Sequence, residues 1–330
     1  MRGLVALDPG ACANIYGDEL LAEIGALVEL VAPPLSSAAL AQRLDLLADV
    51  DVLLSGWGAP RLDEALLAAA PKLAAVFYGA GSVRGLVTDA VWERGLALSS
   101  AWEMNAVPVA EFTIALVFLC LKRTFEFIAA VQANGPGPRP PVLVTGAYRS
   151  KLGIISLGAI GRLVCERLRP FDLDILAYDP FAPDEVFARL GVRRADLDTV
   201  FAECDVVSLH TPNLPSTRGM ITGAHFAAMK PDASFINTSR GDVVREPEMA
   251  AVLAVRPDLW ACLDVLAEID KSAQPQLYAL PNVTITPHIA GSMGPECRRM
   301  GRAMVDELRR WLAGEPLRHQ VTRARFELMA

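Results

Sequence analysis

The alternation of short apolar runs with amphipathic stretches restricts the fold of this chain more than any other feature of its sequence. In the first hundred residues the apolar runs are 3–7, 50–54 and 73–78, and the stretches 35–48 and 62–70 between them have helical spacing. Short buried strands that alternate with helices are typical of β-α-β units, whose strands pair in parallel. We therefore predict a parallel sheet whose functional loops follow the carboxyl ends of its strands.

A second alternating series begins near residue 151 and predicts a second sheet. A predicted helix over 105–131, with Pro108 in its first turn, and a Pro- and Gly-rich loop over 134–141 separate it from the first series. About six strands in the second series fit a complete dinucleotide-binding sheet. They are 152–156, 173–178, 205–210, 233–237, 259–263 and 283–286. A helix over 297–312 and a tail close the chain, whose 330 residues are enough for two domains.

Composition and charge exclude other classes of protein. Apolar residues make up 52% of the chain and charged residues 21%, which is enough apolar material for packed cores. The formal charge of −7 argues against sequence-independent binding to nucleic acid, which depends on Lys and Arg. The longest strongly apolar run, 112–121, is about half a membrane span, and Asp8 interrupts the apolar stretch near the amino terminus. We therefore expect a soluble, cytoplasmic protein with no membrane partner.

The cysteines and histidines are too scattered to predict a metal site. No two cysteines have C-x-x-C spacing, and no cysteine–histidine cluster occurs, so we expect neither structural zinc nor a disulfide framework. His225 and His319 are expected to be structural or solvated.

The turn after the first strand of the second series has the pattern of a nucleotide site. Residues 151–161 read Lys-Leu-Gly-Ile-Ile-Ser-Leu-Gly-Ala-Ile-Gly, an apolar strand that leads through a Gly-rich turn into a helix. Gly158 would let the backbone approach a pyrophosphate, and Gly161 would let the helix pack closely on the strand. Asp179 would accept hydrogen bonds from the ribose and repel a 2′-phosphate, so we predict NAD rather than NADP. The alternative, a glycine-containing turn without a ligand, is disfavoured by Asp179 and by the strand–turn–helix order.

One position departs from the G-x-G-x-x-G pattern, because its first glycine is Ser156 here. If this position needs a positive φ, a serine there costs about 1–2 kcal/mol. We expect a weakened but working nucleotide site.

Polar residues follow four predicted strands, at the sheet edge where a doubly wound sheet binds its ligand. They are His210, Arg240, Asp264 and His288. An Arg fork can bind a 2-oxo acid bidentately and polarise its carbonyl. A His can donate a proton as hydride arrives, or remove one in the reverse direction. We expect His210 to line the pocket or be buried rather than to act as a base.

At these residues the sequence resembles the D-isomer-specific 2-hydroxyacid dehydrogenase family. The resemblance covers nearly the whole chain in the family's order. Besides the glycine turn, the blocks that carry it are 79–81, 105–111, 178–180, 210–212, 229–231, 237–241 (Asn-Thr-Ser-Arg-Gly), 263–265 and 286–292 (Thr-Pro-His-Ile-Ala-Gly-Ser).

The resemblance implies two doubly wound parallel-sheet domains, in which a Rossmann NAD domain is inserted into a flavodoxin-like substrate domain. The substrate-binding domain would comprise 1–103 and 298–330, and the NAD-binding domain 104–297, with the active site in the crevice between them. Members of the family are usually homodimers that pair through the NAD domains.

Site residues follow from the resemblance residue by residue. Arg240 would hold the substrate, His288 would be the acid/base, and the backbone of Gly79, Ala80, Gly81 and Ser82 would meet the substrate carboxylate. Asp264, Thr238 and Val109 would lie near the nicotinamide. The other expected NAD contacts are Gly158, Ala159, Ile160, Gly161, Asp179, His210, Thr211, Pro212, Ser239 and Gly291.

The carboxylate that partners the catalytic His in this family is missing from its usual place. It normally lies five residues after the Asp that matches Asp264, and Ile269 occupies that position here. Three outcomes stay open: Glu268 swings in, another acid such as Asp270 substitutes, or His288 has no carboxylate partner. In the third case, the enzyme would lose part of the roughly 10²–10⁴-fold rate enhancement that general acid–base catalysis contributes.

We predict an NAD-dependent 2-hydroxyacid dehydrogenase of the EC 1.1.1 type, with catalytic Arg240, His288 and Glu268, that interconverts a small 2-hydroxy acid and its 2-oxo acid with modest turnover. The alternative is an NAD(H)-binding sensor or regulatory relative with little or no turnover, which Ser156 and Ile269 motivate. Trp102 and Glu103, just before the long helix, either shape the choice of substrate or only pack and cap that junction.

Overall fold

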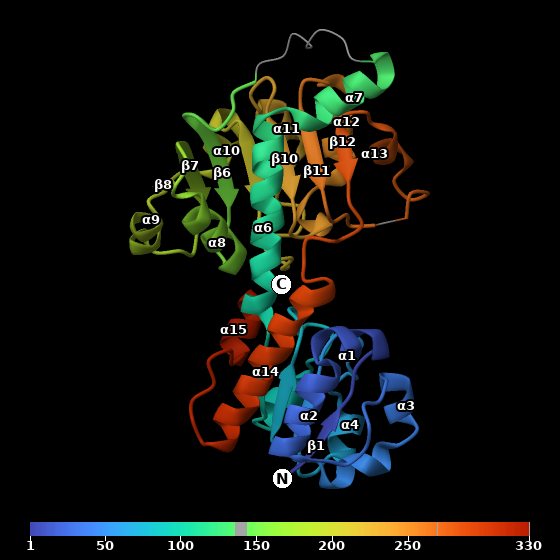
Figure 1. Ribbon diagram of the computed structural model, residues 1–330. Coiled ribbons are helices and arrows are strands. Elements are labelled where there is room, and N and C mark those ends of the chain that lie inside the picture. The colour runs from blue at the N-terminus through green and yellow to red at the C-terminus, as the bar shows by residue number, and fades with distance from the viewer. Residues whose placement is uncertain (136–143, 269, 330) are drawn as a thin grey trace. The chain divides into compact units, whose positions relative to one another are not determined.

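A computed structural model describes residues 1–135, 144–268 and 270–329, which form two compact units. One unit comprises Met1–Ala106 and Ser292–Ala330, and the other comprises Val107–Gly291. Each unit contains one parallel sheet, and Figure 1 labels their elements along the chain. The predicted fold class, with one doubly wound unit inserted into another, is confirmed.

The first unit is built on five parallel strands in the order β2-β1-β3-β4-β5, which is the flavodoxin-like order. The strands are β1 (Arg2–Val5), β2 (Glu29–Leu30), β3 (Val52–Ser55), β4 (Ala75–Tyr78) and β5 (Ala97–Ser100). Helices α1 (Pro9–Ile15), α2 (Gly17–Leu27) and α14 (Cys297–Leu312) share one apolar core with one face of this sheet. Helices α3 (Ser37–Ala41), α4 (Glu64–Ala69), α5 (Asp89–Glu93) and α15 (Arg323–Leu328), with the 3₁₀ turn η1 (Leu44–Asp49), cover the other face.

The second unit is built on seven parallel strands in the order β12-β11-β10-β9-β6-β7-β8. The strands are β6 (Ser150–Ile155), β7 (Leu173–Tyr178), β8 (Arg193–Arg194), β9 (Val206–Leu209), β10 (Ser234–Asn237), β11 (Trp260–Leu263) and β12 (Val283–Ile285). The order reverses between β6 and β9, and such a switch point is where doubly wound sheets bind nucleotides.

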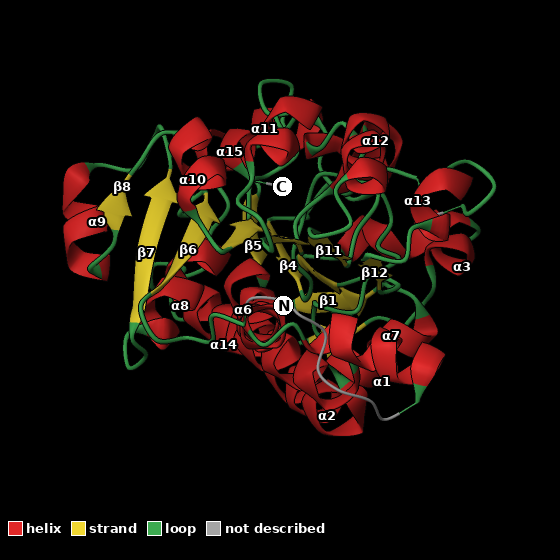
Figure 2. Cartoon of the chain, turned by 90° about the horizontal axis from the view of Figure 1, so that it is seen from above, coloured by secondary structure: helices red, strands yellow, loops and turns green. Residues whose placement is uncertain are grey.

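Helices cover both faces of the seven-stranded sheet. Helices α6 (Trp102–Leu121), α8 (Ala159–Leu168) and α9 (Asp184–Leu190) form one apolar core with it. Helices α10 (Leu197–Glu203), α11 (Gly223–Ala228), α12 (Glu246–Val255) and α13 (Pro275–Ala279) form the other. Figure 2 shows β6 and β7 running between α8 and α10. The central strands β6, β9 and β10 are therefore buried on both faces, which explains their mostly apolar sequences.

The prediction of one helix over 105–131 is wrong. The chain forms α6 and then α7 (Thr124–Asn134), and Pro108 lies inside α6 rather than in its first turn. The break occurs at Arg123, whose φ of 55° is left-handed. Its guanidinium is buried and donates to the carbonyl oxygens of Asp232 and Asp258. These distant contacts hold the turn. The predicted loop over 134–141 falls mostly outside the described residues.

Helix α6 is longer than the apolar run over 112–121 suggests. Its 20 residues are enough, by length and composition alone, to cross a membrane. Half of its most apolar window is buried inside the protein, and one such helix is weak evidence for a membrane span.

Candidate functional site

The glycine turn that follows β6 contains a strained serine. Ser156 has a φ of 80°, and its N–H donates to the carbonyl oxygen of Tyr178 at 2.7 Å. This is the position at which the usual pattern has its first glycine, so the turn does need the left-handed conformation there. A non-glycine residue in this conformation costs about 1–2 kcal/mol.

The two remaining glycines of the turn have different surroundings. A Cβ on Gly158, which caps the amino terminus of α8, would meet no heavy atom within 4 Å. A Cβ on Gly161 would lie 2.2 Å from the carbonyl oxygen of Ser156. Gly158 therefore borders open space at a helix amino terminus, as an approaching pyrophosphate requires, and Gly161 permits close packing of α8 on the turn.

Asp179, after β7, braces the glycine turn. Its Oδ2 accepts from the N–H of Leu157 at 2.7 Å, and its Oδ1 accepts from the N–H groups of Phe181 and Ala182 at 2.8 and 2.9 Å. A carboxylate has about four acceptor sites, so one site at Oδ2 is left for a ribose hydroxyl. Sequence reasoning did not foresee this bracing.

Unsatisfied buried atoms lie after β9, beside the switch point of the sheet. Among the described residues, His210 Nδ1 and Thr211 Oγ1 are buried without a hydrogen-bond partner. Nε2 of His210 lies 3.1 Å from Ser208 Oγ, and burial lowers the pKa of His210 to about 3. His210 is therefore neutral at pH 7 and lacks the imidazolium proton that a general acid donates. Buried polar groups normally have partners, so these two atoms fit a polar ligand such as NAD.

Arg240 follows β10 and forms no ion pair with the described carboxylates. Burial of the guanidinium lowers its pKa, and the negative charge of Asp242 partly opposes this shift. One Nη1–H donates to the carbonyl oxygen of Ser239 at 2.6 Å, and no carboxylate in the described chain forms an ion pair with it. The turn that holds it is compact, because a Cβ on Gly241 would lie 1.8 Å from the backbone nitrogen of Ala267. This arrangement favours an anionic ligand at Arg240.

Thr238 and Ser239 anchor the same turn. Thr238 Oγ1 lies 3.0 Å from the Oγ1 of Thr113 on α6, and Ser239 Oγ donates to the carbonyl oxygen of Thr211. The turns after β9 and β10 are thus joined by a side-chain hydrogen bond.

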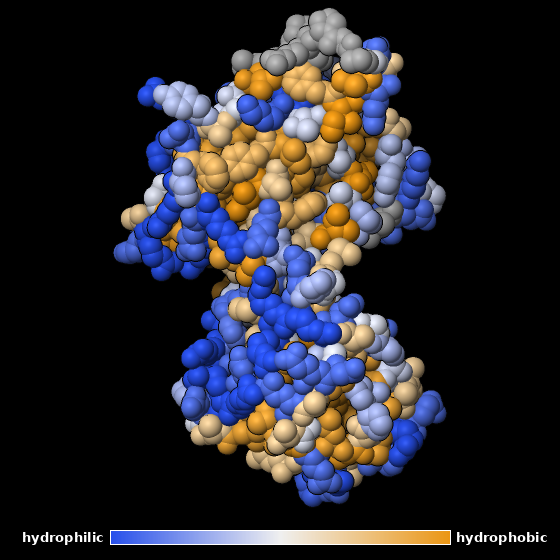
Figure 3. Space-filling model, in the orientation of Figure 1, coloured by the Kyte–Doolittle hydropathy of each residue, from blue (hydrophilic) through white to orange (hydrophobic). Residues whose placement is uncertain are grey.

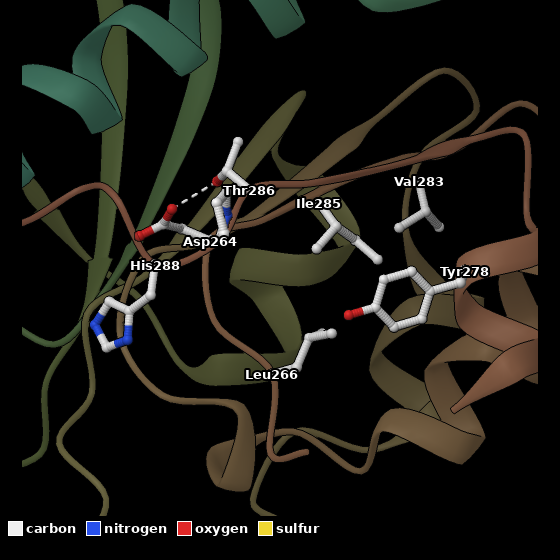
Figure 4. A pocket seen from close by; sticks show the side chains of 8 residues that line it. Asp264, Leu266, Tyr278, Val283, Ile285, Thr286 and His288 are labelled. Carbon is white, nitrogen blue, oxygen red and sulfur yellow. Dashed lines mark hydrogen bonds between the residues drawn. The ribbon is translucent and has the colours of Figure 1, made fainter. Parts of the chain in front are cut away.

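Asp264 and His288 come together after β11 and β12. The buried Asp264 accepts from Thr286 Oγ1 at 2.5 Å and from the N–H groups of Ile289 and Ala290, both at 2.9 Å. His288 is exposed and has a φ of 57°. Figure 4 shows the bond between Asp264 and Thr286 and the His288 imidazole pointing away from that pair.

A pocket of about 380 Å³ adjoins these two residues, and Figure 4 shows its lining. Besides Asp264, Thr286, Pro287 and His288, its walls are Leu266, Tyr278, Val283 and Ile285. Sequence reasoning missed these last four, because apolar and aromatic residues near a strand carry no chemical signal of a site.

The structure does not bring Glu268 to His288. Its side chain is exposed, and no ion pair or hydrogen bond between the two side chains occurs among the described residues. Asp270 is also exposed and caps the N–H of Ser272 at 2.8 Å, while Ile269 lies outside the described residues. The carboxylate that binds the chain on either side of this stretch is the buried Glu246. It accepts from Ala267 N–H at 2.9 Å and from Gln274 Nε2 at 2.5 Å. Burial raises the pKa of Glu246.

The remaining predicted residues are spread over both units. Val109 is buried in α6, and Pro212 and Gly291 lie in loops of the second unit. The loop 79–82 follows β4 in the first unit, where Ser100 Oγ donates to the carbonyl oxygens of Ala80 and Gly81 at 2.9 and 2.6 Å. No group of three or more His, Cys, Asp or Glu side chains in the described ranges could hold a metal ion.

Comparisons with known proteins agree on one family. The profile of the D-isomer specific 2-hydroxyacid dehydrogenase NAD-binding domain matches residues 114–290. An (S)-sulfolactate dehydrogenase of Chromohalobacter salexigens is 34% identical over 253 residues, which cover 76% of this chain and 82% of that protein. A D-3-phosphoglycerate dehydrogenase of Mycobacterium tuberculosis is 32% identical over 257 residues, which cover 78% of this chain but 48% of that protein. The chain thus spans about half the length of that relative.

Solved structures extend the similarity to nearly the whole chain. A D-lactate dehydrogenase with NAD⁺ from Lactobacillus jensenii has 26% sequence identity and a TM-score of 0.78, and the match covers 98% of this chain and all of that one. An NAD-complexed D-isomer specific 2-hydroxyacid dehydrogenase from Lactobacillus delbrueckii has 23% identity and a TM-score of 0.80, with 98% of this chain and all of that chain covered, and supports the fold.

Proposed function

The chain belongs to the D-isomer specific 2-hydroxyacid dehydrogenases, NAD-dependent oxidoreductases of 2-hydroxy and 2-oxo acids, and from this premise we propose that Arg240 and His288 carry out the reaction on a small acid. When bound, NAD(H) would supply or accept the hydride at C2 of the substrate. The alcohol proton passes between the substrate oxygen and His288.

The charge of Arg240 is the observation that carries this proposal. A largely buried guanidinium without a carboxylate partner among the described residues is poorly stabilised until an anion binds. A 2-oxo acid presents two carboxylate oxygens to the guanidinium fork and places its carbonyl beside the positive charge. We retain the backbone of 79–82 as a second contact to the substrate carboxylate.

His288 is the acid/base of the proposed mechanism. Its ring is exposed, and an imidazole can hold or release a proton at physiological pH. His210, whose pKa burial lowers to about 3, does not compete for this role.

NAD is the cofactor of the family, and when bound it supplies or accepts the hydride. In our proposal the open space at Gly158 and the amino terminus of α8 receive the pyrophosphate, and Asp179 receives a ribose hydroxyl. The unsatisfied atoms of His210 and Thr211 gain partners at the same site. Pro212, Thr238, Ser239, Asp264, Gly291 and Val109 complete the proposed contacts.

A second candidate, an NAD(H)-responsive protein with weak turnover, keeps support from two observations. His288 has no carboxylate partner among the described residues, and Ser156 strains the nucleotide turn. We propose the enzyme first, because Arg240 is arranged for an anion that a sensor of NAD(H) alone does not need.

We also propose a cytoplasmic homodimer that pairs through the second unit. Helix α7 has no buried residue, although Ile128 and Val131 are apolar and 48% and 51% exposed. Figure 3, in the orientation of Figure 1, shows apolar side chains over much of this unit's visible face. An apolar surface of this kind supports association with a second copy.

NADH oxidation tests the proposal, with glyoxylate, hydroxypyruvate, pyruvate and phenylpyruvate as oxidants. We expect measurable turnover with at least one acid, and we expect Arg240→Ala to raise KM and lower kcat together. Normal NADH binding without turnover on any acid would favour the sensor, and an unaffected Arg240→Ala enzyme would remove Arg240 from the site.

A further inference from the structure

We propose that Arg325, in the carboxyl-terminal segment 316–329, and Trp102, at the start of α6, together bind a second oxyanion on the substrate. This oxyanion would lie at the end of the substrate opposite the 2-oxo acid group. This inference rests on the proposed function. The substrate class is then a 2-oxo or 2-hydroxy acid that ends in a sulfonate, a phosphate or a second carboxylate.

The segment lies at the edge of the five-stranded sheet where the proposed substrate loop begins. Strands β4 and β5 pair in parallel, with Tyr78 opposite Ser100, so the loop 79–82 and Trp102 leave the sheet at the same edge. The N–H of Ser100 donates to the carbonyl oxygen of His319 at 3.2 Å, and its hydroxyl donates to the carbonyls of the loop. One serine therefore binds both the loop and the carboxyl-terminal segment.

A buried carboxylate fixes the segment in place. Glu307 of α14 is 1% exposed and accepts from the N–H groups of Arg318 and His319, both at 3.0 Å, and from Ser99 Oγ at 2.7 Å. Farther along, Arg84 Nε donates to the carbonyl oxygen of Met329 at 2.8 Å. These bonds fix the segment against the carboxyl edge of the five-stranded sheet.

The charged side chains of this segment differ in their partners. His319 Nδ1 lies 2.8 Å from Glu103 Oε2, so the His319 ring has a polar neighbour at the start of α6. Arg325 donates to the carbonyl oxygen of Gln320 at 2.9 Å, but no carboxylate among the described residues forms an ion pair with it. By contrast, Arg323 on the same helix pairs with Asp89 at 3.2 Å.

Trp102 supplies a second donor. The guanidinium carbon of Arg325 lies 5.5 Å from the centroid of its ring. Its indole Nε1–H is buried and has no acceptor within the described parts of the chain. A buried donor without an acceptor is costly, and an oxyanion held by Arg325 would supply the acceptor. We infer that Trp102 shapes the choice of substrate rather than only packing the junction.

Steady-state kinetics of the full-length enzyme with NADH tests this inference. Pyruvate is compared with 3-sulfopyruvate, 3-phosphohydroxypyruvate and oxaloacetate, and the best of the last three identifies the oxyanion. Loss of a hydrogen bond to a charged group predicts that Arg325→Gln lowers kcat/KM for that acid about tenfold or more, chiefly through KM, and leaves pyruvate within about twofold. Trp102→Phe should show the same selectivity with a smaller loss.

Arg323→Gln is the matched control, because it removes the same charge from the same helix. It should leave kcat/KM unchanged both for pyruvate and for the longer acids. Equal losses with pyruvate and with the longer acids would overturn the inference, and so would a wild-type preference for pyruvate over all three.

Calorimetry separates this inference from the proposed function. We expect 3-sulfolactate or 3-phosphoglycerate to bind the NADH complex more tightly than lactate, and Arg325→Gln to abolish that difference. If no acid is turned over but this difference is found, the proposed function fails and the recognition site stands. Equal binding of the longer acid and lactate by the wild type would overturn the site.

Discussion

Asp264 holds the backbone on both sides of His288. Its carboxylate accepts from the hydroxyl of Thr286 and from the N–H groups of Ile289 and Ala290, and its carbonyl oxygen accepts from the N–H of His288 at 3.0 Å. These bonds stabilise the left-handed φ of 57° at His288. We infer that Asp264 is a positioning residue for the imidazole as well as a proposed neighbour of the nicotinamide.

Replacement of Asp264 by Asn tests this positioning. The amide keeps one acceptor oxygen and replaces the other with an NH2 donor, so one of the two backbone N–H groups loses its acceptor and both lose a charged partner. Because misplacement of a reacting group is costly to the rate, we expect kcat at saturating NADH to fall about tenfold or more. We expect the KM for the acid, which reports binding by Arg240, to change much less.

The matched control is Asp270→Asn, which alters an exposed Asp that caps only Ser272. It should leave kcat unchanged. An Asp264→Asn enzyme with wild-type kcat, or with KM raised as much as kcat is lowered, would argue against a positioning role.

Ser156→Gly should stabilise the protein. The serine has a φ of 80°, which glycine adopts without the steric penalty of about 1–2 kcal/mol. We expect a higher midpoint of thermal unfolding and NADH affinity that is unchanged or tighter, measured by calorimetry and by NADH fluorescence. Ser216→Gly, at an exposed turn position without positive φ, is the control and should be neutral or slightly destabilising. A lower midpoint for Ser156→Gly than for wild type would show that the hydroxyl has a role that outweighs the strain.

His210 predicts a loss of stability in acid. Burial lowers its pKa in the folded protein from 6.5 to about 3, so between these pH values the unfolded chain binds a proton that the folded protein does not. The folded state therefore loses up to about 1.4 kcal/mol per pH unit from this group as the pH falls below 6.5. Urea unfolding at several pH values should give a shallower decline for His210→Gln than for wild type.

Ser208→Ala is the control for this experiment. It removes the hydroxyl beside His210 but keeps the histidine, so it should retain the wild-type slope. Parallel curves for wild type and His210→Gln would show that His210 is protonated in the folded protein.

The sequence predicted the parts of the fold whose cause is local. The central strands are long apolar runs because both faces are buried, and the runs that led to β3, β4, β6 and β9 are of this kind. Strand β8 is two exposed arginines, and β5 ends in two serines whose hydroxyls bond to distant partners, so neither shows an apolar pattern.

At the site, too, the sequence did not predict the contacts between residues that are distant along the chain. Motifs pointed to Arg240, Asp264 and His288, but not to the bonds that Asp264 makes more than twenty residues away. The pair of Glu103 with His319 joins residues that lie far apart in the sequence, and no local pattern indicates such a contact. The break at Arg123 likewise depends on carbonyl groups of Asp232 and Asp258.

The missing carboxylate partner of His288 leads to the last prediction. Glu268 is exposed and does not contact His288 among the described residues, so Glu268→Gln should leave kcat and its pH profile unchanged. Ile269→Glu restores an acid at the position where the family has one, and a carboxylate beside an imidazole favours its protonated form. We expect Ile269→Glu to raise kcat for oxo-acid reduction and to extend activity to higher pH, since the proton donor persists there. Ile269→Gln, which adds bulk and polarity without charge, should do neither. The prediction is wrong if Glu268→Gln lowers kcat and Ile269→Glu does not raise it. Glu268 would then be the carboxylate partner of His288, and its side chain would leave its exposed position during catalysis.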